Sequence, residues 1–409
     1  MLILLAVLFL TAAACPWLVL RTGRRGFLPI AVVPLVGAGW LAAQAPAVAD
    51  GEVRTEVYPW VDTVGMDLAF SLGVVQWLMA MIVLGIGAVV LAYCAWYFRD
   101  RSTGLPRFAG VLVAFVAAML GLVLSDNLLL TYVFWELTTV FSFLLIGHDA
   151  GKRASRRAAI QALVVTTLGG LAMLVGIVLL GEDAGTYRIS ELLADPPSGT
   201  AVTVAVHLLL VGAVSKSAMV PFHFWLPAAM AAPTPVSAYL HAASMVKAGV
   251  FLVAVLAPGF AEVPGWRAVL LTLGTVTMLL GGVRALRQHD LKLLLAHGTV
   301  SQLGLMILVL GLGTRSAMLA GLGLLLAHAL FKAALFLVVG IIDRVAGTRD
   351  LRRLTGLGRG LPALAAVAAI SAASMAGLPP LFGYLAKESV LAALVDAAQY
   401  GDGTGLAGL

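Results

Sequence analysis

Charge is scarce in this sequence. Of its 409 residues, only 11% are Asp, Glu, Lys or Arg, against about 25% in an ordinary soluble domain. Hydrophobic residues make up 61%. Together these values exclude a soluble globular enzyme, a disordered chain and a nucleic-acid-binding protein. The formal net charge of +6, from 26 basic and 20 acidic residues, does not say where the charges lie.

Cysteine is also scarce. The only two, Cys15 and Cys94, lie far apart in apolar runs, so the sequence offers no disulfide framework and no cysteine metal site. There is likewise no glycine-rich phosphate loop between a strand and a helix. We therefore expect neither a metal nor a cofactor in this chain, and any redox centre would have to lie in another protein.

Long apolar segments dominate what is present. A helix that crosses a bilayer needs about 20 apolar residues, and twelve such stretches can be marked. They lie at about residues 1–20, 27–48, 72–98, 108–124, 127–147, 157–180, 202–230, 236–257, 265–286, 290–312, 316–341 and 362–395. Their apolar residues are continuous rather than alternating, which favours helices over a barrel. The sequence predicts an all-α polytopic membrane protein with about twelve transmembrane helices.

The second stretch allows another interpretation, because it follows three arginines and ends in Ala-Val-Ala before Asp50. That pattern imitates a secretory signal with its cleavage site. An apolar stretch of similar length precedes it, and we therefore interpret residues 1–48 as two ordinary spans.

Basic residues alternate from loop to loop. Seventeen fall in one set of loops, near residues 21–25, 99–107, 152–157, 284–287 and 344–359. Only Arg54, Arg188, Arg267 and Arg315 fall in the other set, together with many acidic residues. Cytoplasmic loops are enriched in Lys and Arg. The alternation therefore predicts a multi-pass protein in contact with the lipid bilayer and with its N-terminus outside.

Arginine is absent from the apolar segments, whereas lysine is not. Five of the six lysines lie in or beside them: Lys216, Lys247, Lys292, Lys332 and Lys387. Each would cost about 2.5–3.5 kcal/mol at the bilayer centre. Desolvation can make lysine lose its proton, whereas a guanidinium stays charged. This preference indicates groups that gain and lose protons, although Lys292 could instead extend to the interface.

Glu136 is the clearest acid at membrane depth, and Lys216 in the interrupted seventh segment is its expected partner. The functional interpretation is a carboxylate that controls the protonation of this lysine. The alternative is an ion pair that only holds two helices together.

Two histidines share segments with buried lysines. His241 and Lys247 are six residues apart, about 120° around a regular helix, so contact between them would need a local bulge. His328 and Lys332 are four apart and share one face. We expect all four to belong to a proton path, although each histidine could equally be a core residue.

Prolines interrupt two segments, at Pro221 in the seventh and at Pro379 and Pro380 in the twelfth. Broken helices at matching places of inverted halves point to an ion path at the membrane midplane. The segments are five spans apart and so run in opposite directions. We predict a three-helix region at 1–107, a first five-helix repeat (segments 4–8) at 108–257, and an inverted second repeat (segments 9–13) at 258–409. No thirteenth segment is found, and we expect a C-terminally truncated fragment of a longer protein.

These segments resemble a known family. The similar stretches are residues 134–137 (FWEL), 216–227 (KSAMVPFHFWLP), 232–241 (APTPVSAYLH), 245–249 (MVKAG), 290–292 (DLK), 299–304 (TVSQLG) and 328–332 (HALFK). They look like the proton-translocating antiporter-like subunits of respiratory complex I and of multi-subunit Na+/H+ antiporters. Residues 340–343 (GIID) and 347–351 (GTRDL) look most like the A-type subunit of Mrp antiporters, and the L-type respiratory subunit is the alternative.

The resemblance implies a role for each matching residue. Glu136 and Lys216 match the family's carboxylate–lysine pair, and Lys387 matches its terminal lysine. His241, Lys247, His328 and Lys332 match the central hydrophilic axis.

The implied function is exchange of Na+ for protons, as a transporter and not an enzyme, within a complex of several subunits of the bacterial inner membrane. The alternative is a proton-pumping subunit of NADH-quinone oxidoreductase or of a related membrane-bound hydrogenase, where other subunits supply the redox chemistry.

Overall fold

The computed structural model describes residues 1–99 and 102–399. Within it the chain forms two compact units, Met1–Lys216 and Ser217–Leu409. The loop residue Arg101 and the predicted incomplete end at residues 400–409 lie outside the described residues.

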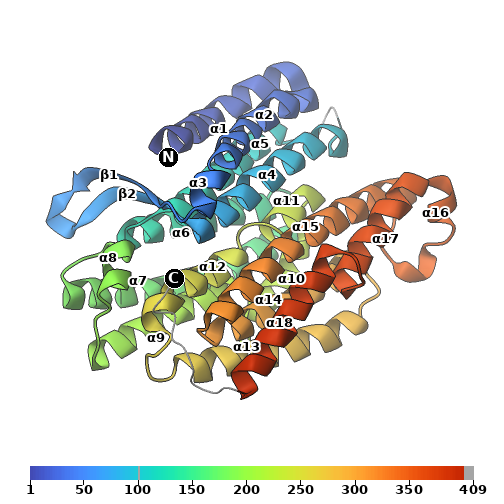
Figure 1. The fold of residues 1–409 in the computed structure, drawn as a ribbon. Coiled ribbons are helices and arrows are strands. Elements are labelled where there is room, and N and C mark those ends of the chain that lie inside the picture. Colours follow the sequence, from blue (N-terminus) through green and yellow to red (C-terminus); the bar gives the residue numbers. More distant parts are fainter. Residues whose placement is uncertain (100–101, 400–409) are drawn as a thin grey trace. The chain divides into compact units, whose positions relative to one another are not determined.

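The first unit is a helical bundle with one small sheet (Figure 1). Its elements are α1 (Leu2–Thr22), η1 (Gly23–Gly26), α2 (Phe27–Ala43), α3 (Ala45–Ala49), β1 (Arg54–Val61), η2 (Asp62–Val64), β2 (Met66–Leu72), α4 (Val74–Tyr97), α5 (Leu105–Leu124), α6 (Leu128–Ile146), α7 (Arg153–Ala184), α8 (Ile189–Ala194) and α9 (Thr200–Lys216). Helix α1 packs on α5, α2 on α4, α6 between α5 and α7, and α7 on α9. The two N-terminal apolar stretches are thus two helices, and both pack against the rest of this unit.

The β1–β2 hairpin was not predicted from the sequence. Its strands pair antiparallel, from Arg54 opposite Leu72 to Val61 opposite Met66, with an irregularity after Tyr58. Charged and polar residues made the region look like a loop, and Leu72, the first residue expected in the third span, is the last residue of β2. That span begins instead at Val74.

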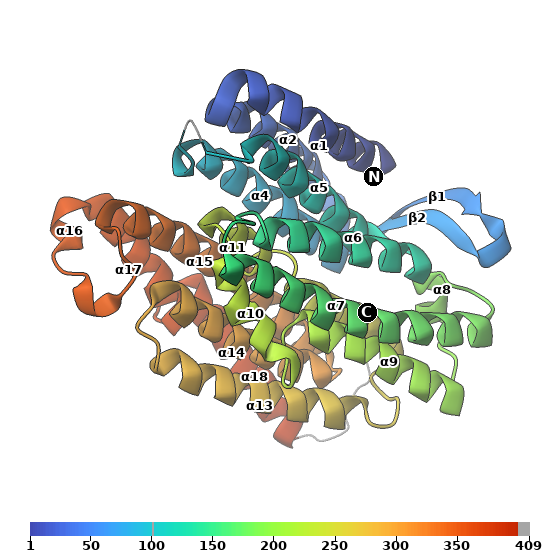
Figure 2. The same ribbon diagram turned by 180° about the vertical axis from the view of Figure 1, so that it is seen from behind.

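The second unit contains the remaining helices (Figure 2). They are η3 (Phe222–Phe224), α10 (Trp225–Ala228), η4 (Ala229–Ala231), α11 (Thr234–Leu240), α12 (Lys247–Phe260), α13 (Trp266–Leu286), α14 (Leu291–Gly311), α15 (Arg315–Ala346), η5 (Leu351–Arg353), α16 (Leu357–Gly360), α17 (Pro362–Ala376) and α18 (Phe382–Gln399). Helix α15 is the hub, because it packs against α11, α14, α17 and α18. Helix α13 packs against α14.

The helices confirm a polytopic membrane protein. Within the described residues, eight helical stretches are long and apolar enough to cross a bilayer, and one of these, Leu2–Ala43, comprises both α1 and α2. Three shorter apolar helices are Thr200–Lys216, Lys247–Phe260 and Pro362–Ala376. Each of the three ends or begins where a helix is interrupted. Each is therefore too short to be counted as a span by its length alone. The number twelve stays a prediction.

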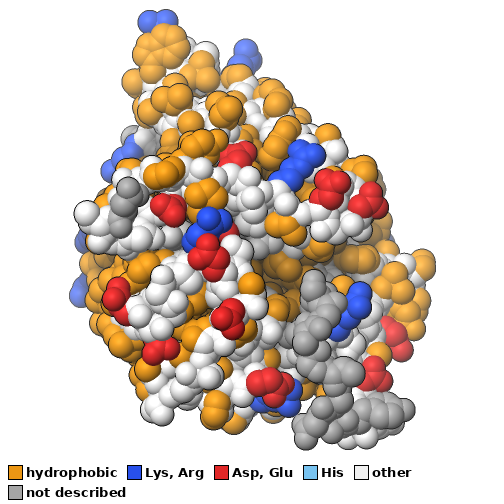
Figure 3. Space-filling view, turned by 60° about the vertical axis from the view of Figure 1, so that its left-hand side comes forward, with side chains coloured by type: hydrophobic (Ala, Val, Ile, Leu, Met, Phe, Trp, Pro, Cys, Tyr) orange, Lys and Arg blue, Asp and Glu red, His pale blue; other side chains and the backbone are white. Residues whose placement is uncertain are grey.

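Contacts within the first unit agree with the alternation of loop charges. At one end, Arg24 Nη1 donates to the Phe98 carbonyl at 3.4 Å, and the Phe98 and His148 rings lie 6.3 Å apart. These residues come from three of the arginine-rich loops. At the other end, Asn127 Nδ2 donates to the carbonyl of Gly65, in the hairpin, at 2.9 Å. Figure 3 shows the side on which the hairpin lies, with acidic side chains scattered over it.

The two units repeat one local motif. Asn127 caps α6 by accepting from the backbone N–H groups two and three residues later, at 3.0 and 3.2 Å. Asp290 caps α14 in the same way at 2.8 and 3.1 Å. Each cap residue also forms an isolated β-bridge, Asn127 with Arg188 and Asp290 with Asp350. The bridged residues follow α7 and α15, which are both 32 residues long.

This motif supports the inverted repeat. Asp290 stands 163 residues after Asn127, and Asp350 stands 162 residues after Arg188. Segments 5 and 10 are therefore equivalent, as are segments 6 and 11. Because five predicted spans separate each pair, we expect the equivalent helices to cross the membrane in opposite directions. The repeat boundaries at 107/108 and 257/258 stay predictions.

Candidate functional site

Lys216 is the last residue of α9, and its side chain is fully buried. Its Nζ donates to the Trp135 carbonyl at 2.6 Å, to Thr138 Oγ1 at 2.6 Å and to Thr139 Oγ1 at 3.1 Å. All three oxygens belong to α6. An ammonium has three N–H donors, so this arrangement satisfies the charged form completely. The Trp135 ring adds a cation–π contact, with its centroid 4.4 Å from Nζ.

The two threonine hydroxyls can also adapt to a loss of charge. Thr138 Oγ1 donates to the Trp135 carbonyl at 2.7 Å, and Thr139 Oγ1 donates to the same carbonyl at 3.2 Å. A hydroxyl can accept or donate. If Lys216 releases a proton, either threonine can turn its O–H toward the free lone pair of the amine.

Glu136 follows Trp135, so it stands one residue from the carbonyl that Lys216 binds. Its side chain is half-buried, and its Oε1 has no hydrogen-bond partner among the described residues. The structure places the expected pair on adjacent helices of one unit, but within the described chain no ion pair of 4 Å or less joins them. Glu136 is therefore close enough to act on Lys216 through space, without a direct hydrogen bond.

The helical conformation of α9 ends immediately after Lys216. Ala218 adopts a φ of 52°, a left-handed conformation that costs an L-residue about 1–2 kcal/mol. Pro221 follows, and the chain continues as η3 and α10. The break predicted from Pro221 is present, and backbone strain accompanies it. Strained backbone of this kind concentrates at functional sites.

The eighth segment is also broken, which the sequence did not predict. It was expected to be one helix over 236–257. Instead α11 ends at Leu240, residues 241–246 form turns, and α12 begins at Lys247. The Lys247 Nζ donates to the carbonyl of Ala242, inside the break. His241 and Lys247 therefore lie at the two ends of a helix interruption and not along one helix.

No proline or glycine marks this break. Ser244 Oγ donates to the Tyr239 carbonyl at 2.8 Å, so a side chain satisfies a backbone oxygen that a continuous helix would use. A serine in an apolar segment is a weak signal, which is why the interruption escaped prediction.

Lys292 and Lys332 both donate to backbone carbonyls of the second unit. Lys292 Nζ binds the carbonyls of Met230 and Ala232 at 3.0 and 2.7 Å, at the end of η4. Lys332 Nζ binds the Leu295 carbonyl at 3.0 Å. Lys292 is only 1% exposed, so it does not extend to the interface. The role of Lys292 in a relay stays a prediction.

Two histidines are buried with unpaired rings. Both ring nitrogens of His241, and both of His328, have no hydrogen-bond partner among the described residues. The His241 ring is tilted against the Trp225 ring, with centroids 6.0 Å apart, and the His328 ring meets the Phe331 ring in a T-shaped contact at 5.5 Å. An ordinary core histidine would have at least one partner. Both imidazoles thus lack a hydrogen-bond partner among the described residues, and their place in a proton path stays a prediction.

Lys387 lies on α18, at the break in the twelfth segment. Its Nζ donates to the carbonyls of Met375 and Ala376 at 2.7 and 3.2 Å. These are the last residues of α17, just before Gly377 and the prolines Pro379 and Pro380. Lys387 is partly exposed, unlike the other four lysines at membrane depth.

The five lysines thus share one kind of environment. Each donates to at least one backbone carbonyl: Trp135 for Lys216, Ala242 for Lys247, Met230 and Ala232 for Lys292, Leu295 for Lys332, and Met375 and Ala376 for Lys387. Most of these carbonyls lie at helix interruptions, where the intrahelical donor is missing. Lys247, Lys292 and Lys387 donate to carbonyls at such interruptions, whereas the carbonyls of Trp135 and Leu295 lie within α6 and α14.

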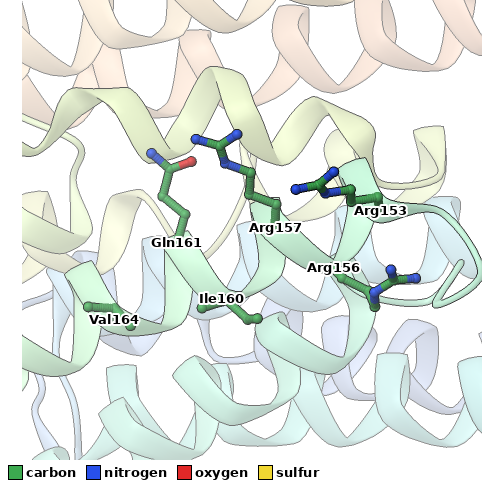
Figure 4. A pocket seen from close by; sticks show the side chains of 6 residues that line it. All are labelled: Arg153, Arg156, Arg157, Ile160, Gln161 and Val164. Atoms are coloured by element: carbon green, nitrogen blue, oxygen red, sulfur yellow. The ribbon is translucent and has the colours of Figure 1, made fainter.

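A surface cavity lies at the N-terminal end of α7 (Figure 4). It is lined by Arg153, Arg156, Arg157, Ile160, Gln161 and Val164. Arg157 and Gln161 point to the same side of the helix (Figure 4). In the described part of the chain, no group of three or more His, Cys, Asp or Glu side chains is placed to hold a metal ion.

Comparison with known proteins places this chain in a family. Residues 125–401 match the family model described as NADH:quinone oxidoreductase/Mrp antiporter, transmembrane. A putative antiporter protein, mnhA2 of Staphylococcus haemolyticus, is 42% identical over 401 residues, covering 93% of this chain and 50% of that protein. The A-type subunit of the Na(+)/H(+) antiporter of Alkalihalophilus pseudofirmus is 42% identical over 387 residues, covering 90% of this chain and 48% of that protein. The A/B-type subunit of a probable K(+)/H(+) antiporter of Rhizobium meliloti is 45% identical over 358 residues, covering 86% and 35%.

Two solved structures share the fold of this chain. A chain of the Mrp complex from Dietzia sp. superposes with a TM-score of 0.90 at 40% identity, covering 97% of this chain and 43% of that one. A chain of an archaeal membrane-bound sulfane sulfur reductase has the same fold, with a TM-score of 0.85 at 23% identity, covering 97% and 81%. The chain spans about half the length of the antiporter A-type subunits it matches. It belongs to the NADH:quinone oxidoreductase/Mrp antiporter transmembrane family.

Proposed function

We propose that this chain is a membrane subunit of a multi-subunit cation/proton antiporter. It translocates protons along buried glutamate, lysine and histidine side chains in exchange for a monovalent cation, Na+. The observation that carries the proposal is the set of five lysines at membrane depth, each bonded to backbone carbonyls. In this scheme it serves as a transporter component of the bacterial cell membrane, with its N-terminus outside.

The chemistry begins at Lys216. Its three N–H groups fit three oxygens of α6, and the carboxylate of Glu136 on the same helix favours the charged form through space. Movement of Glu136 weakens this stabilisation, and Lys216 then releases its proton toward the other buried side chains. His241 and Lys247, with Lys292, His328, Lys332 and Lys387, carry it onward.

The test is ion exchange by the whole antiporter complex in sealed vesicles. We expect Glu136→Ala and Lys216→Ala each to abolish exchange, because each removes one partner of the switch. Lys216→Arg should also abolish exchange, since a guanidinium cannot release its proton. Normal exchange in the two alanine variants would contradict the proposal, and full activity of Lys216→Arg would mean that only a fixed charge is needed.

The family model also covers subunits of NADH:quinone oxidoreductase, which would drive the same relay by redox chemistry elsewhere. The relatives at about 40% identity are named as antiporter subunits, and this favours exchange. Purification separates the two: copurifying flavin and iron–sulfur subunits would support the redox-driven complex, and small antiporter subunits would support the exchanger.

A further inference from the structure

Two of the ionisable side chains proposed above lie with their charged ends against a glycine of the facing helix. A Cβ added at Gly170, on α7, would stand 2.1 Å from Glu136 Oε1. A Cβ added at Gly298, on α14, would stand 2.9 Å from Lys332 Nζ. Both distances are shorter than real Cβ contacts. Each charged tip therefore occupies the space that the Cβ of any residue other than glycine would fill.

Helix packing does not account for these two glycines. Around Gly170 the three atoms nearest to the added Cβ belong to the side chains of Glu136 and Trp135, and the Trp135 atom is at 3.7 Å. Around Gly298 the one atom of a facing helix within 4 Å, among the described residues, is Lys332 Nζ. Gly176, about two turns further along α7, is different: its added Cβ would meet the backbone oxygen of Ala205 at 2.6 Å. Gly176 permits close approach of two helices, whereas Gly170 and Gly298 make room for a charged group.

The internal repeat relates the two sites. Lys332 stands 162 residues after Gly170, which is the spacing between the equivalent helices α7 and α15. Gly298 stands 163 residues after Trp135, which is the spacing between the caps of α6 and α14. In the first repeat the charge is on segment 5 and the glycine on segment 6. In the second repeat the glycine is on segment 10 and the charge on segment 11.

We propose that Gly170 and Gly298 are positioning residues for proton translocation. Each fixes where the facing charged tip stands, Glu136 in the first repeat and Lys332 in the second, by leaving space for it against the neighbouring helix. The equivalent helix interface thus holds an acid in the first repeat and a base in the second. The inference rests on the function proposed above.

The first test is replacement of each glycine by alanine in the whole complex. The clashing atom is the end of a flexible side chain, so we expect normal assembly and an unchanged or higher melting temperature, because alanine favours helix. Exchange should nevertheless fall about tenfold or more, since misplacing a reacting group by about 1 Å can cost this much. Gly323→Ala should keep full exchange, because among the described residues no atom of another segment lies within 4 Å of a Cβ added there.

The second test separates positioning from packing. Gly176→Ala crowds α9 without touching an ionisable group, so it should lower stability and leave the midpoint of the pH–rate profile unchanged. Gly170→Ala should move that midpoint by about half a pH unit or more, because the carboxylate no longer stands at the same distance from Lys216. A loss of amplitude without a shift would overturn the proposal for Gly170.

Different variants test the proposed function and the positioning role. Normal exchange in Glu136→Ala would defeat the proposed function itself. Normal exchange in both Gly170→Ala and Gly298→Ala, with Glu136→Ala inactive, would defeat only the positioning role. As an independent readout, the rate at which a carbodiimide labels Glu136 should change in Gly170→Ala, and an unchanged rate would show that the carboxylate has not moved.

Discussion

Lys216 has three separate acceptors, and two of them are hydroxyls that a single substitution can remove. Thr138→Val keeps the side-chain shape and deletes the hydroxyl 2.6 Å from Lys216 Nζ. A hydrogen bond to a charged group contributes about 1.5–3 kcal/mol. We therefore expect slower exchange and a shift of its pH–rate profile, because the ammonium form is less well satisfied. Both are measured in sealed vesicles across a pH series.

Thr131→Val is the matched control for this experiment. Thr131 is also buried on α6, but its hydroxyl donates to the Asn127 carbonyl at 2.9 Å and does not contact Lys216. This variant should leave the pH–rate profile in place. Equal profiles for Thr138→Val and Thr131→Val would mean that the hydroxyl does not take part in holding the proton.

Asp350 lies outside the membrane spans, and its ion pair leads to a prediction about how stability depends on pH. Hydrogen bonds from Arg352 hold the pKa of its carboxyl down, to about 2. A lowered pKa means that the stabilisation is present above the ordinary pKa of about 3.9 and is lost only as pH falls toward 2. The melting temperature difference between Asp350→Asn and the parent should therefore be constant from about pH 5 to about pH 9. A difference that changes across this range would show that Asp350 titrates there.

The individual contacts mark where sequence analysis reaches its limit. The types of residue could be predicted, because a lysine or glutamate in an apolar segment is costly wherever it lies. The partners could not be predicted. Trp135 contributes a carbonyl, which every residue has, and Thr138 and Thr139 are threonines, a common residue type in membrane helices. Nothing in the sequence alone distinguishes Gly170 from the many packing glycines.

Among the helices, the two repeats begin segments 5 and 10 with the same kind of cap. Replacing an Asn or Asp cap with alanine costs about 1 kcal/mol. Asn127→Ala and Asp290→Ala should therefore both lower the melting temperature. Each cap makes one further contact, Asn127 with Gly65 at 2.9 Å and Asp290 with Arg349 at 3.3 Å, so we expect losses of similar size.

Asp290→Asn is the discriminating variant for this prediction. It keeps the capping oxygen and removes the charge that pairs with Arg349, so its loss should be smaller than that of Asp290→Ala. The ion pair is partly exposed, and exposed pairs contribute little. If Asp290→Asn lowers the melting temperature as much as Asp290→Ala does, the stabilisation comes from the ion pair and not from the cap.

The interruptions of helices show a similar limit for sequence analysis. The breaks near Pro221 and at Pro379 and Pro380 were predicted, because proline removes a backbone donor. The break between His241 and Lys247 was not, because it contains neither proline nor glycine and is maintained by Ser244 and Lys247. The hairpin at residues 54–72 was missed because exposed strands with many polar residues lack the apolar runs used to find spans.

For the molecule as a whole, orientation in the membrane is the main open prediction. The charge alternation puts the β1–β2 hairpin outside the cell and the loop before α7 in the cytoplasm. Both native cysteines are buried, at 1% and 0% exposure, so they leave a low background for thiol labelling. Val64, at the tip of the hairpin, is 51% exposed, and Ala150 is exposed in the loop before α7.

A membrane-impermeant maleimide should therefore label Val64→Cys on intact cells and should label Ala150→Cys only after the membrane is opened. The reason is electrostatic: arginines near residues 21–25, 99–107 and 152–157 are retained on the cytoplasmic side as the spans insert. The inverse pattern would place the N-terminus inside and would reverse the direction in which Glu136 and Lys216 face the proton gradient. Labelling of both positions on intact cells would contradict the span count between the hairpin and α7, because an odd number of crossings separates the two sites.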